Sequence, residues 1–132
     1  MIKAVDHVAI AVSRIEDALQ IYQHTLGLGL ESTKLVEQQK VKIAILRAGE
    51  TKIELVEPTD PDSSVAKFIA NRGEGIHHIA IEVSNIEEHI KELKEKGVAM
   101  IDEKPRPGAE ARKIAFIHPR STRNVLLELV EY

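Results

Sequence analysis

Two histidines and two glutamates recur at matching places in the two halves of this sequence. His7 stands in DHVAIAV and His78 in HHIAIEV, 71 residues further on. Glu54 stands in IELVE and Glu128 in LELVE, 74 residues apart. Two imidazoles and two carboxylates suit a divalent ion such as Co, Ni, Mn, Zn or Fe. In an octahedral shell this set would leave about two positions for water or substrate oxygens, as catalytic sites do.

The alternative to a metal site is that these four residues only make buried polar contacts. A single histidine on a strand is usually structural, whereas a glutamate buried in an apolar strand needs a polar partner. Because both residue types recur in a repeat, we favour metal ligation. The other histidines are expected to be solvated or structural: His24 and His89 on helices, His77 on the opposite strand face from His78, and His118 before a proline.

Each half opens with a strand pattern followed by a helical one. Bulky residues alternate with small ones over 8–12, so the bulky face is expected to pack on a helix. The segments SRIE at 13–16 and SNIE at 84–87 predict capping boxes at two helix N-termini. These helices are expected to end near Gly27 and Gly97. Further strands are predicted at 30–36, 41–46, 52–57, 98–101, 113–117 and 125–130, and a connecting helix at 64–72 that ends at Gly73.

This pattern predicts an α+β fold of two tandem βαβββ modules. We expect the modules to pair about a pseudo-two-fold axis into a concave, partly closed, eight-stranded mixed sheet with the helices outside. That pairing would bring the four candidate ligands to one cavity. The predicted organisation is a single domain, residues 1–132, with modules at about 1–57 and 75–132 and a connector at 58–74.

Composition narrows the classes of function. The chain of 132 residues is 43% hydrophobic and has no cysteine, which excludes disulfides, thiolate metal sites and thiol nucleophiles. A net charge of −3 and only two Phe and two Tyr argue against nucleic-acid binding. No apolar run reaches the length of about 20 residues that spans a bilayer, so no membrane association is expected and a cytoplasmic location is predicted.

Several segments closely resemble the methylmalonyl-CoA epimerases, a family within the vicinal oxygen chelate (glyoxalase/bleomycin resistance/dioxygenase) superfamily. They are DHVAIAV, TKIELVEP, the connector DSSVAKFIANRGEGIHHIAIEV, FIHP at 116–119 and VLLELVE. The resemblance implies epimerisation of methylmalonyl-CoA at its α-carbon, with a divalent ion, cobalt above Ni, Mn, Zn or Fe, stabilising the enolate. It also implies an acyl-CoA substrate and a homodimer.

The resemblance assigns two carboxylates to proton transfer. Glu128 matches a family position that is both metal ligand and acid/base. The second carboxylate of the family lies in the turn before Val41, where strict alignment places Gln38. We expect Glu37 to serve as the second base through a locally shifted turn.

Two other functions remain open from the sequence. A glyoxalase I-type lactoylglutathione lyase also uses paired metal ligands and proton transfer. A non-catalytic small-molecule-binding protein of the same fold generally lacks the full ligand set, whereas this chain keeps all four candidates. An extradiol dioxygenase is favoured less, because that chemistry uses two histidines and one carboxylate.

Overall fold

The computed structural model describes residues 2–132, and residue 1, where the first predicted module begins, lies outside them. The chain folds into two compact units. The N-terminal unit is His7–His77, and the C-terminal unit is His78–Tyr132 together with the described residues up to Asp6. The predicted α+β class is confirmed, with eight strands of a mixed sheet arising from two βαβββ modules.

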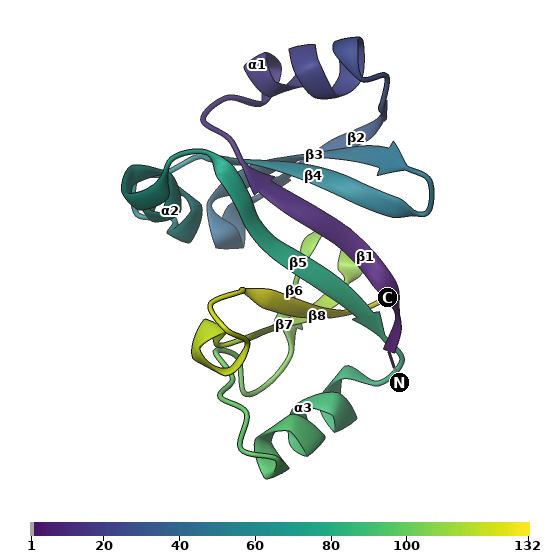
Figure 1. Cartoon of the computed structure of the whole chain (residues 1–132), viewed down its shortest axis with the longest axis vertical. Coiled ribbons are helices and arrows are strands. Elements are labelled where there is room, and N and C mark those ends of the chain that lie inside the picture. Colours follow the sequence, from purple (N-terminus) through teal and green to yellow (C-terminus); the bar gives the residue numbers. More distant parts are fainter. Residues whose placement is uncertain (1) are drawn as a thin grey trace. The chain divides into compact units, whose positions relative to one another are not determined.

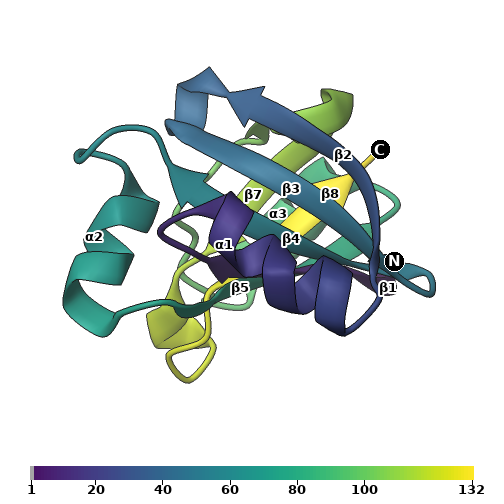
Figure 2. The ribbon, with the colours of Figure 1, turned by 90° about the horizontal axis from the view of Figure 1, so that it is seen from above.

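The strands of the N-terminal unit follow the order β2-β3-β4-β1. β1 (Ile2–Ala11) runs parallel to β4 (Thr51–Pro58), and β3 (Val41–Ala48) is antiparallel to both β4 and β2 (Gly29–Val36). A short 3-10 turn, Glu37–Gln39, joins β2 to β3. In Figure 1, α1 lies over these strands, and Figure 2 shows it crossing in front of β3 and β4.

The helix of the first module packs on the bulky face of β1, as predicted. α1 (Ile15–Leu19) continues into a π-helical segment, Gln20–Thr25, and the helical run stops before Gly27, which has φ of +85°. Ile15 is buried in a cluster with Val12, Leu46 and Leu55. Burial of such aliphatic side chains is the main favourable term in folding.

The start of α1 differs from the predicted capping box. The N-cap residue is Arg14, and its side chain makes no capping hydrogen bond. The amide of Ile15 donates instead to Glu57 Oε1 at 2.8 Å, and the amide of Ser13 donates to Glu74 Oε2 at 2.7 Å. Carboxylates from distant segments therefore bind the amides at and just before the start of α1. The local spacing of residues in the sequence could not reveal these contacts.

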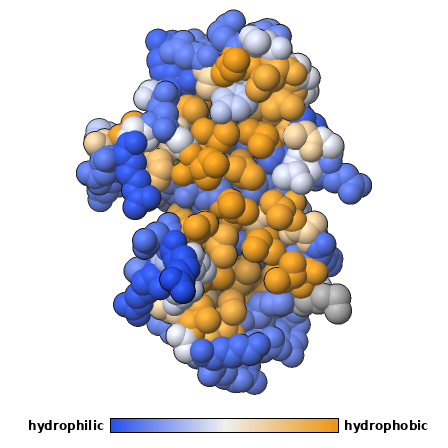
Figure 3. All heavy atoms as spheres, in the orientation of Figure 1, coloured by the Kyte–Doolittle hydropathy of each residue, from blue (hydrophilic) through white to orange (hydrophobic). Residues whose placement is uncertain are grey.

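The strands of the C-terminal unit follow the order β5-β8-β7-β6. β5 (Gly75–Val83) is parallel to β8 (Leu127–Glu131), which is antiparallel to β7 (Lys113–Ile117). α3 (Ile86–Glu95) buries Ile86 and Ile90 against residues of these strands, including Leu129. On the face drawn in Figure 3, apolar side chains gather over the strands of this unit and hydrophilic ones cover α3.

The capping of α3 is shifted by one residue from the prediction. Asn85, not Ser84, is the N-cap, and its Oδ1 accepts from the amide of Glu88 at 3.3 Å. The amide of Ile86 donates to Glu131 Oε1 at 2.9 Å, which repeats the contact between Ile15 and Glu57. Each module thus joins its helix N-terminus to the end of its last strand.

The predicted strand at 98–101 is wrong. Only Met100 forms an isolated bridge, to Ile117, and the strand beside β7 is the two-residue β6 (Arg106–Pro107). The Asp102 carboxylate accepts from the amide of Phe116 at 2.9 Å, in place of a backbone carbonyl. Proline residues at 105 and 107 lack the N–H that a longer ladder needs. Two 3-10 turns, Ala109–Ala111 and Pro119–Ser121, complete this unit.

The connecting helix forms where the sequence predicts it. α2 (Ser64–Arg72) is capped by Ser63 Oγ, which accepts from the amide of Ala66 at 3.0 Å, and it stops at Gly73 with φ of +79°. No helix within residues 2–132 is long and apolar enough to cross a membrane.

A buried polar cluster connects the middle of β1 to the C-terminal residue of the sequence. The Asp6 carboxylate accepts from Tyr132 Oη at 2.8 Å and lies 3.5 Å from Arg112 Nη1. Asp6 and Arg112 are both buried, and Arg112 Nε also donates to the carbonyl of Ala109 at 2.7 Å. Buried charges are tolerated when they are paired in this way.

Candidate metal centre

The N-terminal unit buries one of the two predicted ligand pairs. His7 lies on β1 and Glu54 on β4, where Glu54 is the register partner of Ala9. Because His7 and Ala9 are two residues apart, their side chains share a strand face. His7 Nδ1 lies 3.3 Å from Glu54 Oε2, and the two residues are only 1% and 2% exposed.

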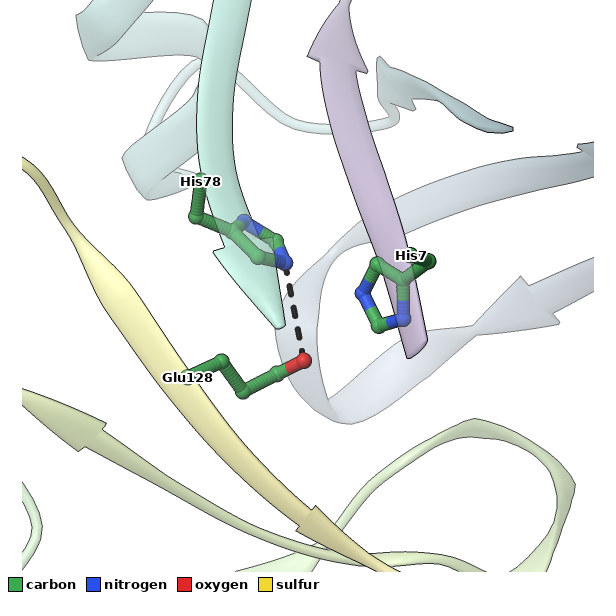
Figure 4. Close-up of side chains that lie close together, drawn as sticks. All are labelled: His7, His78 and Glu128. Carbon is green, nitrogen blue, oxygen red and sulfur yellow. Dashed lines mark ion pairs between the residues drawn. The ribbon is translucent and has the colours of Figure 1, made fainter. Parts of the chain in front are cut away.

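The C-terminal unit builds the second pair in the same way. His78 lies on β5 and Glu128 on β8, where Glu128 is the register partner of Ala80. His78 Nε2 lies 3.6 Å from Glu128 Oε1. Figure 4 shows the His78 imidazole turned toward the Glu128 carboxylate, and it also labels His7 on β1.

The spacing within each pair fits two neighbouring ligands of one cation. Ligands that bind an ion at about 2.1 Å and at right angles lie about 3 Å apart, close to the observed 3.3 Å and 3.6 Å. His7 and Glu54 belong to one group of residues whose potential ligand atoms lie within 4.8 Å of one another, and His78 and Glu128 belong to another. Imidazole nitrogen beside carboxylate oxygen is a donor set that divalent transition metals accept.

Glu37 and Gln38, the two residues considered for the second base, lie exposed in the turn between β2 and β3. β3 begins at Val41, whose register partner on β4 is Pro58, four residues beyond Glu54. At about 3.3 Å per residue, that end of β4 is roughly 13 Å from Glu54 along the strand. The role of Glu37 as a base stays a prediction.

The structure also identifies Phe116, which the sequence marks only as part of a family motif. It is the register partner of Glu128 on β7, and its ring lies edge-on to the His78 imidazole, with centroids 5.2 Å apart and an interplanar angle of 89°. Its place opposite Glu128 follows from the register between β7 and β8, which the sequence does not specify. Glu57 and Glu131 could have been found earlier, because both stand in the repeated LVE motif.

Three of the remaining histidines have the structural or exposed positions that the sequence predicts. His77 packs edge-on against Phe68, with ring centroids 5.1 Å apart. His118 caps the turn that follows it, accepting at Nδ1 from the amide of Arg120 at 3.1 Å. His24 is exposed. None of these three is placed in either ligand pair.

The chain belongs to the glyoxalase/bleomycin resistance protein/dioxygenase superfamily, whose sequence model matches residues 6–116. Methylmalonyl-CoA epimerases are prominent among the proteins that it resembles. The mitochondrial methylmalonyl-CoA epimerase of Homo sapiens is 36% identical over 125 residues, which cover 94% of this chain and 71% of that protein. The ethylmalonyl-CoA/methylmalonyl-CoA epimerase of Cereibacter sphaeroides is 35% identical over 131 residues, which cover 98% of each chain.

A solved epimerase structure extends this likeness to the fold. A methylmalonyl-CoA epimerase in complex with methylmalonyl-CoA and NH4+ superimposes with a TM-score of 0.94 at 33% sequence identity. The match covers 99% of this chain and 95% of that one.

Proposed function

We propose that this chain is an epimerase that inverts the α-carbon of methylmalonyl-CoA. The observation that carries the proposal is the end-to-end likeness to an epimerase bound to that substrate, in a chain that has two buried His–Glu pairs. This favours an isomerase acting on an acyl-CoA over the lactoylglutathione lyase or a non-catalytic binding protein.

The proposal includes one divalent ion held by His7, Glu54, His78 and Glu128. Support comes from the duplicated pairs, each with neighbouring-ligand spacing, and from the two imidazoles and two carboxylates that they supply. A bound divalent cation would supply electrostatic stabilisation of the negative charge that develops on the thioester oxygen. Cobalt is the ion that we favour, with Ni, Mn, Zn and Fe as alternatives.

Proton transfer is assigned to the carboxylates of this chain. Glu128 takes the α-proton: the C–H bond breaks, its electron pair passes into the thioester, and the proton stays on the carboxylate. A second group must deliver a proton to the opposite face of the planar intermediate, and the roles reverse in the other direction. We assign that role to Glu37, because the amide of Gln38 cannot take up a proton as a carboxylate does.

The resemblance to the epimerases also leads us to propose that the protein is a homodimer, and the lack of a long apolar run or signal-peptide pattern leads us to propose a cytoplasmic location. The chain is proposed to be one functional domain of two repeats, since each repeat supplies only two of the four ligands.

Solvent deuterium exchange into the α-position of methylmalonyl-CoA tests the proposed reaction. Cobalt-loaded protein should exchange the α-proton, whereas Glu128→Gln should lose exchange by at least about a hundredfold, the usual scale of a general-base contribution. Glu95→Gln is the matched control, because Glu95 is an exposed carboxylate at the end of α3. Full activity of Glu128→Gln would contradict its role.

The second base and the alternative enzyme need separate comparisons. Loss of exchange in Gln38→Ala but not in Glu37→Gln would show that the second base is misassigned. Turnover of the methylglyoxal–glutathione hemithioacetal, without exchange into methylmalonyl-CoA, would favour the lyase.

A further inference from the structure

The ring of Phe116 contacts one of the two candidate histidine ligands. Its edge-on packing against His78 places an aromatic ring beside the imidazole, while His78 Nε2 points toward Glu128 at 3.6 Å. Perpendicular aromatic pairs of this kind have a preferred geometry, because the positive edge of one ring meets the negative face of the other. Phe116 is itself only 8% exposed, so its ring has little freedom to move.

Two further side chains hold Phe116 from the outer side. The guanidinium carbon of Arg106 lies 5.5 Å from the centroid of the Phe116 ring, a cation–π distance. Arg106 Nε lies 3.1 Å from Asp102 Oδ1, and Asp102 Oδ2 accepts from the backbone amide of Phe116 at 2.9 Å. Asp102 therefore binds both the backbone of Phe116 and the cation that covers its ring.

The first module has a different residue at the corresponding position. Ile45 is the register partner of Glu54 on β4, as Phe116 is of Glu128 on β8. The two modules thus share the His–Glu pair but differ in the side chain opposite the glutamate. This difference marks Phe116 as a special feature of the second module and not a general requirement of the fold.

We propose that Phe116 is a positioning residue that fixes the ring plane of His78, with Arg106 and Asp102 holding Phe116 in place. The proposal rests on the proposed function, because it presumes that His78 is a metal ligand. Outer-shell partners orient ligands without touching the ion, and loss of a hydrogen-bonded one typically weakens metal binding about ten- to a hundredfold; for an aromatic contact we expect the lower end of that range. An imidazole that is free to rotate would lose conformational entropy when a cation binds, and this loss would lower the affinity.

Cobalt binding to the metal-free full-length chain, measured by calorimetry, tests the proposal. Phe116→Ile installs the residue of the first module and should weaken cobalt binding about tenfold. Arg106→Met, which leaves the buried ring in place, should weaken it about two- to fivefold. Ile114→Val is the matched control, since Ile114 belongs to the same buried cluster as Phe116 and lies two residues away on β7. This control should lower the melting temperature and leave cobalt affinity unchanged.

A second readout requires neither metal nor substrate. In the metal-free protein, the NMR signals of the His78 imidazole should broaden in Phe116→Ile and stay sharp in Ile114→Val, because only the first change frees the ring.

Three outcomes would overturn the proposal, and they differ from one another. Failure of the unmodified protein to bind cobalt would remove the proposed metal function and this inference with it. Normal cobalt binding by both Phe116→Ile and Arg106→Met would overturn the inference alone. Equal weakening by Ile114→Val would show that general packing of the cluster, and not ring orientation, controls affinity.

Discussion

Removal of the Glu131 carboxylate should loosen the attachment of α3 to β8 and lower the stability of the protein. Glu131 Oε1 accepts from the amide of Ile86 at 2.9 Å, in a contact that is partly buried. A charged acceptor at a helix N-terminus satisfies a free amide and interacts favourably with the helix dipole. We expect Glu131→Ala to cost about 1.5 kcal/mol, within the usual range for loss of an N-terminal cap.

This cost predicts a measurable shift in thermal unfolding. At about 2.1 cal/mol/K per residue, a chain of this length has an unfolding entropy of roughly 0.28 kcal/mol/K, so the melting temperature should fall by about 5 °C. Circular dichroism at 222 nm would follow the transition. Glu131→Gln, which keeps an oxygen acceptor but loses the charge, should fall by about half as much.

The duplicated contact supplies an independent comparison. Glu57 Oε1 accepts from the amide of Ile15 at 2.8 Å, so Glu57→Ala should cost a similar amount. Glu95→Ala, at the exposed C-terminal end of α3, should leave the melting temperature within about 1 °C. If Glu131→Ala were as stable as the unmodified protein, the carboxylate would not hold the helix, and our explanation for the repeated LVE motif would be refuted.

Two further predictions concern local structure. Gly108→Ala should destabilise the protein by about 1–3 kcal/mol, because a Cβ at this position would lie 2.8 Å from Ile114 Cγ2. The control is Gly29→Ala, whose added Cβ would meet nothing within 4 Å and should be nearly neutral. Urea unfolding of the two variants measures the difference in stability. A hydrogen bond from Lys94 lowers the pKa of the Glu103 carboxyl in the folded protein. Any stability that this exposed pair contributes should therefore be present at neutral pH and be lost as the pH falls through the lowered pKa. NMR titration of the Glu103 carboxyl should give the lowered pKa, and an ordinary value in Lys94→Met would confirm its cause.

The sequence predicted most of the strands and the candidate ligands because both leave a repeated pattern. His7 and His78 could be aligned from the strand pattern around them, and the structure pairs each with the glutamate from its own module. Helix α2 was predicted at its observed bounds because Gly73 gives a local stop signal, and the structure adds the local cap at Ser63. These features depend on residues close together in the chain.

The errors arose where distant segments decide the local structure. The start of α1 was misplaced because Glu57 supplies the capping oxygen from the end of β4, whereas α3 has a local cap, Asn85, one residue beyond the predicted Ser84. The strand predicted at 98–101 failed because Asp102 occupies the amide of Phe116. The role proposed for Phe116 depends on the register between β7 and β8, which no spacing in the sequence specifies.

The buried contact between Asp6 and Arg112 has a consequence for any attempt to separate the two copies. Asp6 belongs to the sequence of the first copy, yet it is grouped with the second unit and supplies a carboxylate to Arg112 and Tyr132 there. A fragment limited to the second copy would leave that guanidinium without its counter-charge, at a cost of several kcal/mol for a buried ion. The second copy therefore depends on a carboxylate from the segment that opens the first, so a cut between the copies would not follow the boundary of the C-terminal unit.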